Sequence, residues 1–203
     1  MLATYKDVEL YFDLIDSRQP HPISFFEAMT ALAFVAFAEH PVDIGVIEVG
    51  MGGEWDATNI VHSQVSVITP IGLDHTEYLG ETLEEIAATK SGIIKQESHV
   101  VLAAQPPEVA KILLSKVAEK SATPYREGIE FSVSQRNLAV GGQVVSINGI
   151  YGEHNEIFIP LYGAHQASNA AIALAAVEVF AQTAIDADVV ARAFANIESP
   201  GRC

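Results

Sequence analysis

The sequence has 203 residues, 49% of them hydrophobic, which is enough to build one large domain or two small ones. Its 26 acidic residues outnumber its 11 basic residues, and the net charge of −15 argues against nucleic acid and anionic membranes as partners. The single cysteine, Cys203, excludes an intrachain disulfide and a cysteine-based metal site, which fits a reducing cytoplasm. No apolar run reaches the roughly 20 residues of a membrane span, and no secretory signal opens the chain. The acidic charge either serves solubility or accompanies a site that recruits Mg2+.

Two helices are predicted first. Residues 3–16 carry apolar side chains at roughly helical spacing. After the turn-forming "SRQPHP", a second helix is predicted at 24–40, with Ser24 as its N-cap and Glu27 as the capping-box partner. Residues 28–38 are its most apolar part, and they indicate a buried core helix that is too short to span a membrane.

Short runs rich in valine and isoleucine then alternate with helical patterns. The runs at 42–50, 63–71 and 99–105 predict buried strands, and helices are predicted at 81–95 and 106–122. Strands that alternate with helices indicate βαβ units and a parallel sheet.

The helix predicted at 81–95 has clear boundary signals. Thr82 and Glu85 form a capping box, and Gly92 is placed to end the helix.

The pattern changes near residue 124. Residues 129–161 alternate apolar and polar side chains and contain "GG" and "NG" turn signals, which predict antiparallel hairpins. Helices return at 164–182 and 186–197, the second capped by Asp186. The predicted fold class is therefore α/β, a mostly parallel sheet flanked by helices with a small antiparallel insertion. The expected boundaries are about 1–123 and 162–203 for the α/β core and about 124–161 for the insertion.

Three ionisable residues lie at the ends of predicted core elements: Glu48, His75 and Lys90. Ligands of open α/β sheets gather at the carboxyl ends of the strands, so Glu48 and His75 are expected to face one crevice. A carboxylate and an imidazole there can share a divalent cation, although Mg2+ prefers oxygen ligands. Each residue also has a simpler interpretation: a salt-bridge partner, a hydrogen-bonded histidine and a helix-end lysine favoured by the helix dipole. The residues alone leave both interpretations open.

Four segments resemble a known family. They occur in the order found in the Mur ligase superfamily, and they are most similar to its folylpolyglutamate synthase / dihydrofolate synthase branch. The first two are long and specific, and the resemblance reaches from residue 24 to residue 202. The segments are "EVGMGGEWDATN" (48–59), "ITPIGLDHTEYLGETLEEIAATKSGIIK" (68–95), "GAHQASNAAIAL" (163–174) and "PGR" (200–202).

The resemblance implies the central ATPase domain of an ATP-dependent ligase, with a P-loop-NTPase-like fold. Such enzymes transfer the γ-phosphate of ATP to a carboxylate of dihydropteroate or of a (poly)glutamylated folate. The amine of L-glutamate then attacks the acyl phosphate to form an amide. The implied partners are these small molecules with Mg2+ as cofactor, and the implied location is the cytoplasm. The oligomeric state is not indicated.

The same resemblance implies roles for the three ionisable residues. Glu48 and His75 match the residues that bind the second Mg2+, and Lys90 matches a lysine that is carbamylated on Nζ. A carbamate converts the lysine cation into an anion that helps to bind the cations around the γ-phosphate.

Weaker matches extend to the substrates. Asn169 matches the residue that contacts adenine, and Arg202 matches the arginine that reaches the ATP phosphates. Aromatic side chains suit a flat pterin through stacking. The residues that match segments lining the pterin or folate pocket are Ser24, Phe25, Trp55, Asp56 and Asn59.

These matches also have simpler interpretations. Asn169 is also consistent with an amide on a helix surface, and Arg202 with a terminal charge. Phe25 and the next phenylalanine are consistent with core-facing positions of a helix. The segment "DATN" is consistent with a loop held by side-chain hydrogen bonds. The family often has an arginine at the position of Glu54, so a contact that this arginine makes in the family has no counterpart in this residue type.

One family motif does not occur. A search for G-x-x-x-x-G-K-[ST] finds only "TKSG" at 89–92, whose lysine belongs to the carbamate block. In the family this P-loop precedes the first helices, and a glutamate-binding domain follows "PGR". We expect the chain to contain most of the central domain without either part, and to be inactive alone, because the P-loop supplies much of the stabilisation of phosphoryl transfer. The alternatives are a peptidoglycan Mur-type amino-acid ligase and a non-catalytic, P-loop-less paralogue that binds pterin or a partner chain.

Overall fold

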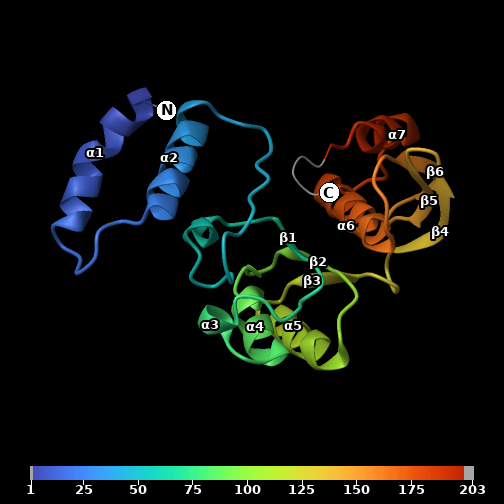
Figure 1. Cartoon of the computed structure of the whole chain (residues 1–203), viewed down its shortest axis with the longest axis horizontal. Coiled ribbons are helices and arrows are strands. Elements are labelled where there is room, and N and C mark those ends of the chain that lie inside the picture. Colours follow the sequence, from blue (N-terminus) through green and yellow to red (C-terminus); the bar gives the residue numbers. More distant parts are fainter. Residues whose placement is uncertain (1, 199–203) are drawn as a thin grey trace. The chain divides into compact units, whose positions relative to one another are not determined.

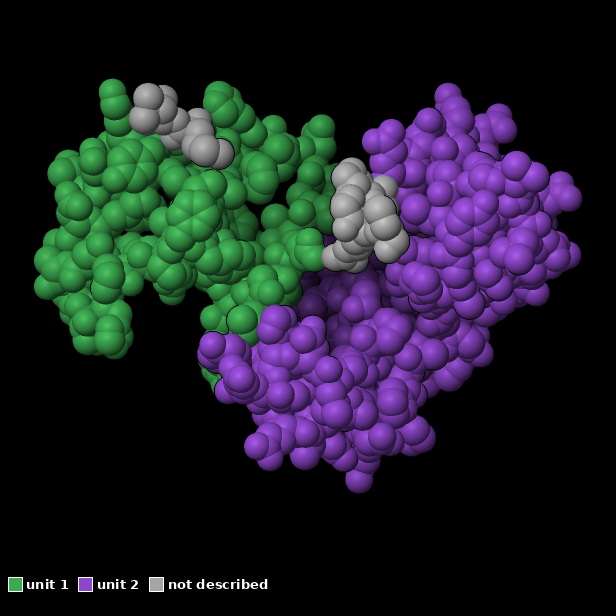
Figure 2. Space-filling model, viewed as in Figure 1, with its two compact units in different colours: residues 1–61 green, residues 62–203 purple. Residues whose placement is uncertain are grey.

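The structure is a computed structural model that describes residues 2–198 (Figure 1). The chain divides into two compact units, residues 1–61 and residues 62–203 (Figure 2). Among the described helices, none combines the length and the apolar character needed to cross a membrane.

The first unit contains the two predicted helices, α1 (Leu2–Asp16) and α2 (Phe25–Glu39), and the short 3-10 helix η1 (Ala57–Ile60). The capping box at the start of α2 is confirmed: the Ser24 hydroxyl accepts from the Glu27 N–H at 3.3 Å, and the Glu27 carboxylate accepts from the Ser24 N–H at 2.8 Å. The prediction of a buried core helix is wrong for most of α2, because only Leu32 is buried. In the described part of this unit no sheet covers the apolar side chains of α2.

The strand predicted at 42–50 is not formed. This segment has no regular secondary structure, and Ile44 and Val46 are 61% and 94% exposed. A strand requires a neighbour to take its backbone hydrogen bonds, and no described segment pairs with this one. Glu48 therefore does not end a sheet strand, and its expected place at a strand end is corrected.

The second unit contains the predicted parallel sheet. Its strands are β1 (Val65–Ile68), β2 (His99–Leu102) and β3 (Thr123–Arg126), in the order β1-β2-β3. All pairs are parallel, so all three strands end at the same edge. The strands predicted at 63–71 and 99–105 are confirmed. The third strand, β3, lies where the change of pattern near residue 124 predicts the start of the antiparallel insertion. The parallel sheet therefore extends further along the chain than predicted.

Helices cover both faces of this sheet. On one face lie α4 (Leu83–Ser91) and α5 (Pro107–Glu119), with the short α3 (Thr76–Leu79) beside α4. Val100 and Leu102 point to that face, whereas Val101 between them points to the other, as the alternation of a strand requires. The capping box of Thr82 and Glu85 is confirmed, and Gly92 is the C-cap of α4.

The antiparallel sheet consists of β4 (Ser132–Ala139), β5 (Gly142–Asn148) and β6 (Glu153–Ile159), in that order. The predicted hairpins are confirmed. A Cβ at Gly142 would collide with the backbone of Ile159, so the close approach of β5 and β6 requires a glycine there.

The long helix α6 (Ala164–Ala181) contacts both sheets of the second unit. Leu174 and four buried alanines of α6 share one core with Val101 of the parallel sheet and with Val145 and Ile147 of the antiparallel sheet. The last helix, α7 (Ala187–Ala195), is capped by Asp186 as predicted and lies against β6 (Figure 1).

A buried carboxylate fixes the β5–β6 turn on α6. Glu178 is fully buried, and its Oε2 accepts hydrogen bonds from the N–H groups of Ile150 (2.6 Å) and Tyr151 (3.1 Å). Its Oε1 lies 2.9 Å from Nε2 of His154, whose Nδ1 is buried without a hydrogen-bond partner.

Candidate active site

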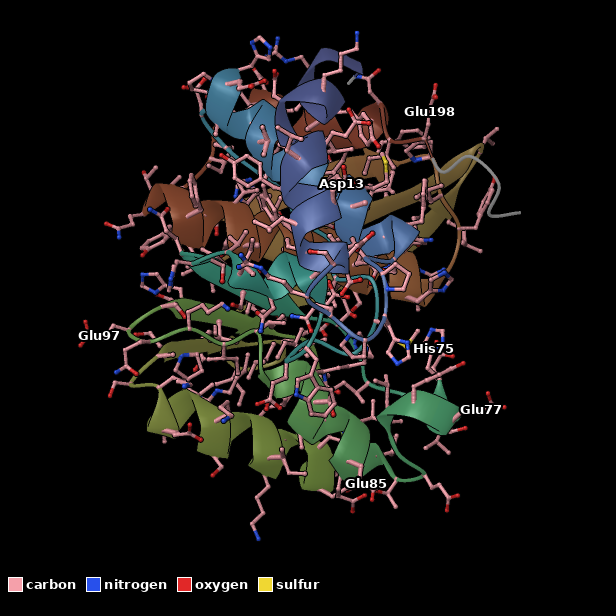
Figure 3. The ribbon with its side chains drawn as sticks, turned by 90° about the vertical axis from the view of Figure 1, so that its left-hand side faces the viewer. Asp13, His75, Glu77, Glu85, Glu97 and Glu198 are labelled. Carbon is pink, nitrogen blue, oxygen red and sulfur yellow. The ribbon has the colours of Figure 1, made fainter. Side chains whose placement is uncertain are left out.

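The carboxyl edge of the parallel sheet carries a histidine on the loop that follows β1. His75 has a left-handed backbone conformation (φ 51°), which costs a non-glycine residue on the order of 1 kcal/mol. Its N–H donates to Oδ1 of Asp74 at 2.8 Å, and its carbonyl accepts the first hydrogen bonds of α3 from Tyr78 and Leu79. The ring is about half exposed, with Nε2 3.7 Å from Oδ2 of Asp74. Glu97 lies just before β2, and Figure 3 shows it and His75 on opposite sides of the second unit.

Lys90 lies in the last turn of α4, where the helix dipole favours a cation. It is half-buried, and in residues 2–198 its ammonium makes neither a hydrogen bond nor an ion pair. The described structure contains no direct hydrogen bond or ion pair between Lys90 and His75.

Glu48 belongs to the first unit, whereas His75 and Lys90 belong to the second. Its carboxylate is exposed and accepts no hydrogen bond from the described residues. In residues 2–198 no three side chains of histidine, cysteine, aspartate or glutamate form a group that can hold a metal. The donor types still suit a Mg2+ ion that keeps several waters, because Glu48 supplies free oxygens and a carbamate on Lys90 would supply more. The shared cation site stays a prediction.

Two segments of the first unit that were matched to a pterin or folate pocket lie in contact. A Cβ on Gly50 would collide with the ring of Phe26, so the start of α2 packs directly on the loop that begins there. Phe25 and Trp55, which belong to these two segments, are 82% and 75% exposed. The core-facing interpretation of Phe25 is therefore wrong, and both rings are accessible to a ligand.

Asp56 holds the same loop in shape. Its Oδ1 accepts from the N–H (2.9 Å) and the hydroxyl (2.6 Å) of Thr58, and its Oδ2 accepts from the N–H of Met51 (2.8 Å). Burial raises the pKa of Asp56, but these hydrogen bonds lower it more, so the pKa lies below its ordinary value. Asn59 donates to the carbonyl of Glu54 at 3.1 Å. Both side chains are thus used within the loop, as the hydrogen-bonded interpretation of "DATN" requires.

Asn169 is exposed near the start of α6, and its amide lies 3.4 Å from Oε1 of Gln166. Ser24, matched to the substrate pocket, is occupied as the cap of α2 and also donates to Glu27 at 2.7 Å. Arg202 lies outside the described residues.

Two residues that sequence reasoning missed lie at the carboxyl edge. Gln105 follows β2 and hydrogen-bonds to the loop after β1, and Glu127 follows β3 and hydrogen-bonds to α6. The available signal was a polar residue within a few positions of the end of a buried strand.

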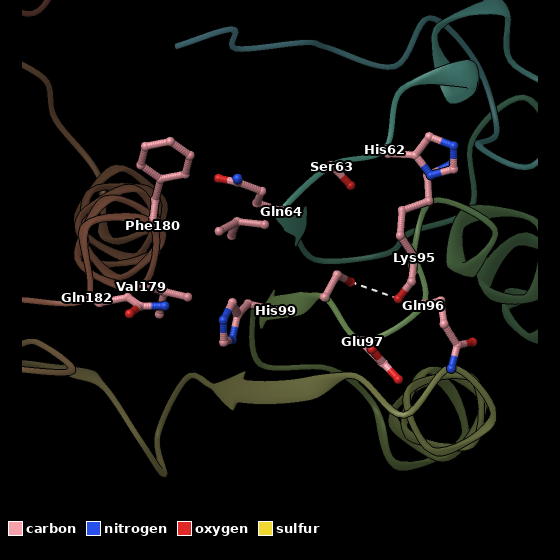
Figure 4. Close-up of a pocket in the computed structure, with 12 residues that line it drawn as sticks. His62, Ser63, Gln64, Lys95, Gln96, Glu97, His99, Val179, Phe180 and Gln182 are labelled. Atoms are coloured by element: carbon pink, nitrogen blue, oxygen red, sulfur yellow. Dashed lines mark hydrogen bonds between the residues drawn. The ribbon is translucent and has the colours of Figure 1, made fainter. Parts of the chain in front are cut away.

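A separate cavity of about 500 Å3 lies at the opposite, amino ends of β1 and β2 (Figure 4). His62, Lys95 and His99 line it together with Phe180 of α6. None of the predicted site residues lines this cavity.

The parallel sheet with polar groups beyond its strand ends defines an α/β protein whose ligands are expected at the carboxyl edge. Residues 5–177 match the family model described as the Mur ligase middle domain. A dihydrofolate synthase/folylpolyglutamate synthase from Mycobacterium tuberculosis is 44% identical over 99% of this chain and 45% of its own length.

Solved structures agree. Mycobacterium tuberculosis folylpolyglutamate synthase complexed with ADP and AMPPCP is 46% identical, with a TM-score of 0.93 over 98% of this chain and 47% of that chain. An FPGS complex with AMPPCP and folate is 32% identical, with a TM-score of 0.92 over 99% of this chain and 50% of that chain. The chain spans about half the length of these relatives. It belongs to the Mur ligase family, in the folylpolyglutamate synthase / dihydrofolate synthase branch.

Proposed function

We propose that this chain is the central nucleotide-binding part of an ATP-dependent folate ligase. The reaction joins a carboxylate of dihydropteroate or of a (poly)glutamylated folate to L-glutamate through an acyl phosphate. The observation that carries the proposal is the 46% identity and TM-score of 0.93 with a synthase complexed with ADP and AMPPCP. The relatives favour the folate branch over a peptidoglycan ligase.

Most of the residues with nucleotide roles belong to the second unit. Asn169 would contact adenine from the start of α6, and Arg202 would reach the phosphates. Mg2+, when bound, would neutralise charge on the phosphates, with Glu48 and His75 as ligands. Lys90 would act as a carbamate, because an ammonium at this position would repel the cation.

The first unit supplies the pterin or folate contacts. Phe25 and Trp55 offer exposed ring faces, which suit stacking on a flat heterocycle. Ser24, Asp56 and Asn59 would shape this surface, and the hydrogen bonds of Asp56 show how the loop that carries Trp55 is held.

The 203 residues contain no P-loop motif, so the chain alone is expected to lack ligase turnover. An assay of ATP conversion to ADP that depends on dihydropteroate or folate plus L-glutamate tests this expectation, and turnover by the purified chain would contradict it.

The substrate class is tested by fluorescence, because Trp55 is the only tryptophan in the chain and is 75% exposed. Dihydropteroate should quench the fluorescence of Trp55 in a saturable manner. A parallel titration of free tryptophan amide corrects for the inner-filter effect. Phe25→Ala should weaken the binding, whereas Phe37→Ala, at the other end of α2, is the matched control. Quenching no greater than that of the free amide, or saturation by a UDP-linked acid instead, would contradict the folate assignment.

A further inference from the structure

Beyond the ends of the strands, two side chains continue the lateral hydrogen bonding of the parallel sheet. The last backbone bonds run from the Ala103 N–H to the Ile68 carbonyl and from the Glu127 N–H to the Leu102 carbonyl, both 2.9 Å. Past these points the loops diverge toward different helices, and their backbones no longer pair as strands.

Gln105 joins the loop after β2 to the loop after β1. Its Oε1 accepts from the N–H of Ile71 at 3.0 Å, and its Nε2 donates to the carbonyl of Thr69 at 2.9 Å. The side-chain amide thus makes the same donor and acceptor pair that a neighbouring strand would make. The loop held in this way leads to His75.

Glu127 makes the corresponding connection on the other side of β2. Its Oε2 accepts from the N–H of Ala104 at 2.9 Å, next in sequence to Gln105. Its Oε1 accepts from the hydroxyl of Ser168 at 2.6 Å, and Ser168 directly precedes Asn169 on α6. One carboxylate therefore connects the ends of β2 and β3 to the early part of α6.

We propose that Gln105 and Glu127 are positioning residues that hold the His75 loop and the Asn169 turn of α6 in one fixed arrangement. Together they form a side-chain belt, defined as the chain of hydrogen bonds from Thr69 through these two residues to Ser168. A reaction slows when mobile loops let the reacting groups leave their productive geometry. Hydrogen bonds that fix these loops before the ligand binds prevent this loss. The assignment rests on the proposed function only in treating His75 and Asn169 as parts of one nucleotide site.

The belt is tested by NMR on the 203-residue chain, without nucleotide first. Gln105→Ala should shift or broaden the His75 ring signals and raise amide exchange in the 69–75 loop by about tenfold or more. Glu127→Ala and the milder Ser168→Ala should change the side-chain amide signals of Asn169. Glu127→Gln should restore most of them, because its Oε1 can accept from Ala104 while its Nε2 donates to Ser168. Gln96→Ala and Glu97→Gln are matched controls at the amino end of β2.

A titration with Mg2+ and ADP then separates the two claims. If wild type binds, the Kd should rise about tenfold in Gln105→Ala and in Glu127→Ala, and little in the controls. If wild type does not bind but the His75 and Asn169 signals respond as stated, the belt stands and the proposed nucleotide role of this chain fails. The belt is overturned if Gln105→Ala and Ser168→Ala leave both sets of signals as the controls do, or if Glu127→Gln behaves like Glu127→Ala.

Discussion

The two apolar runs at 42–50 and 63–71 are both rich in valine and isoleucine but have different structures. The second contains β1, paired in register with β2 and covered by helices, whereas the first is irregular, with Val46 94% exposed. The difference teaches that an apolar run becomes a strand only where a neighbouring strand takes its hydrogen bonds. The same contrast extends to the carboxylates that organise each unit: Glu178 is fully buried in the second, and Asp56 is partly exposed in the first.

The largest effect is expected at Glu178. Glu178→Ala would leave the N–H groups of Ile150 and Tyr151 without their acceptor and the buried His154 ring without its hydrogen-bond partner. Breaking such a buried arrangement should lower the free energy of unfolding of the second unit by about 4 kcal/mol. Urea unfolding measures this, with the exposed Glu119 replaced by alanine as control. A loss below about 1 kcal/mol would show that the turn does not depend on this carboxylate.

Two isoleucines compare the cores directly. Ile86 of α4 is fully buried and Ile44 is 61% exposed. Ile86→Ala should therefore cost about 3 kcal/mol through lost burial and a cavity, whereas Ile44→Ala should change stability by less than about 0.5 kcal/mol. Equal losses in the two variants, measured by urea unfolding, would contradict the described difference in packing.

The sequence predicted the features that depend on nearby residues and failed for those that depend on distant partners. Local signals predicted α1, α2 and the capping boxes at Ser24 and Thr82, because these depend on residues a few positions apart. The hairpins were also predictable from alternation and turn residues. Burial of α2 and pairing of 42–50 depend on partners distant in the sequence, and those predictions were wrong.

The candidate site divides similarly. Positions at the ends of predicted core elements singled out His75 and Lys90, and motif resemblance added Trp55. The structure shows these side chains at least partly exposed. Gln105 and Glu127 were missed because their partners lie between 23 and 41 residues away. The local signal, a polar residue just after a buried strand, does not indicate those partners. The joint Mg2+ role of Glu48 and His75 remains a prediction.

A smaller effect is expected at Asp56. Asp56→Ala removes the acceptor for Met51 and Thr58 at the start of η1, which should cost about 1 kcal/mol locally. Amide exchange of Met51 and Thr58 should rise while the unfolding of the second unit stays unchanged. If exchange is unaltered, the loop is held by other contacts and the Asp56 account is wrong.

The smallest effect concerns pH. The hydrogen bond from Arg126 holds the pKa of Glu130 below its ordinary value of 4.5 despite partial burial. The ionised carboxylate therefore stabilises the fold above pH 4.5, and that contribution is lost as the pH falls through the lowered pKa. Both side chains are partly solvated, so the contribution is less than about 1 kcal/mol. Glu130→Gln should be less stable than wild type at neutral pH and converge with it in acid; a difference that persists in acid would contradict this assignment.

The central proposal, that this chain carries the carbamylated-lysine part of its family's ligase site, is tested most directly at Lys90. The purified chain is incubated with 13C-bicarbonate and Mg2+, and its 13C NMR spectrum is recorded. We predict a carbamate signal that disappears in Lys90→Arg and persists in Lys95→Arg, the matched control five residues along the chain. The absence of the signal, or a signal that Lys90→Arg leaves unchanged, would contradict the account.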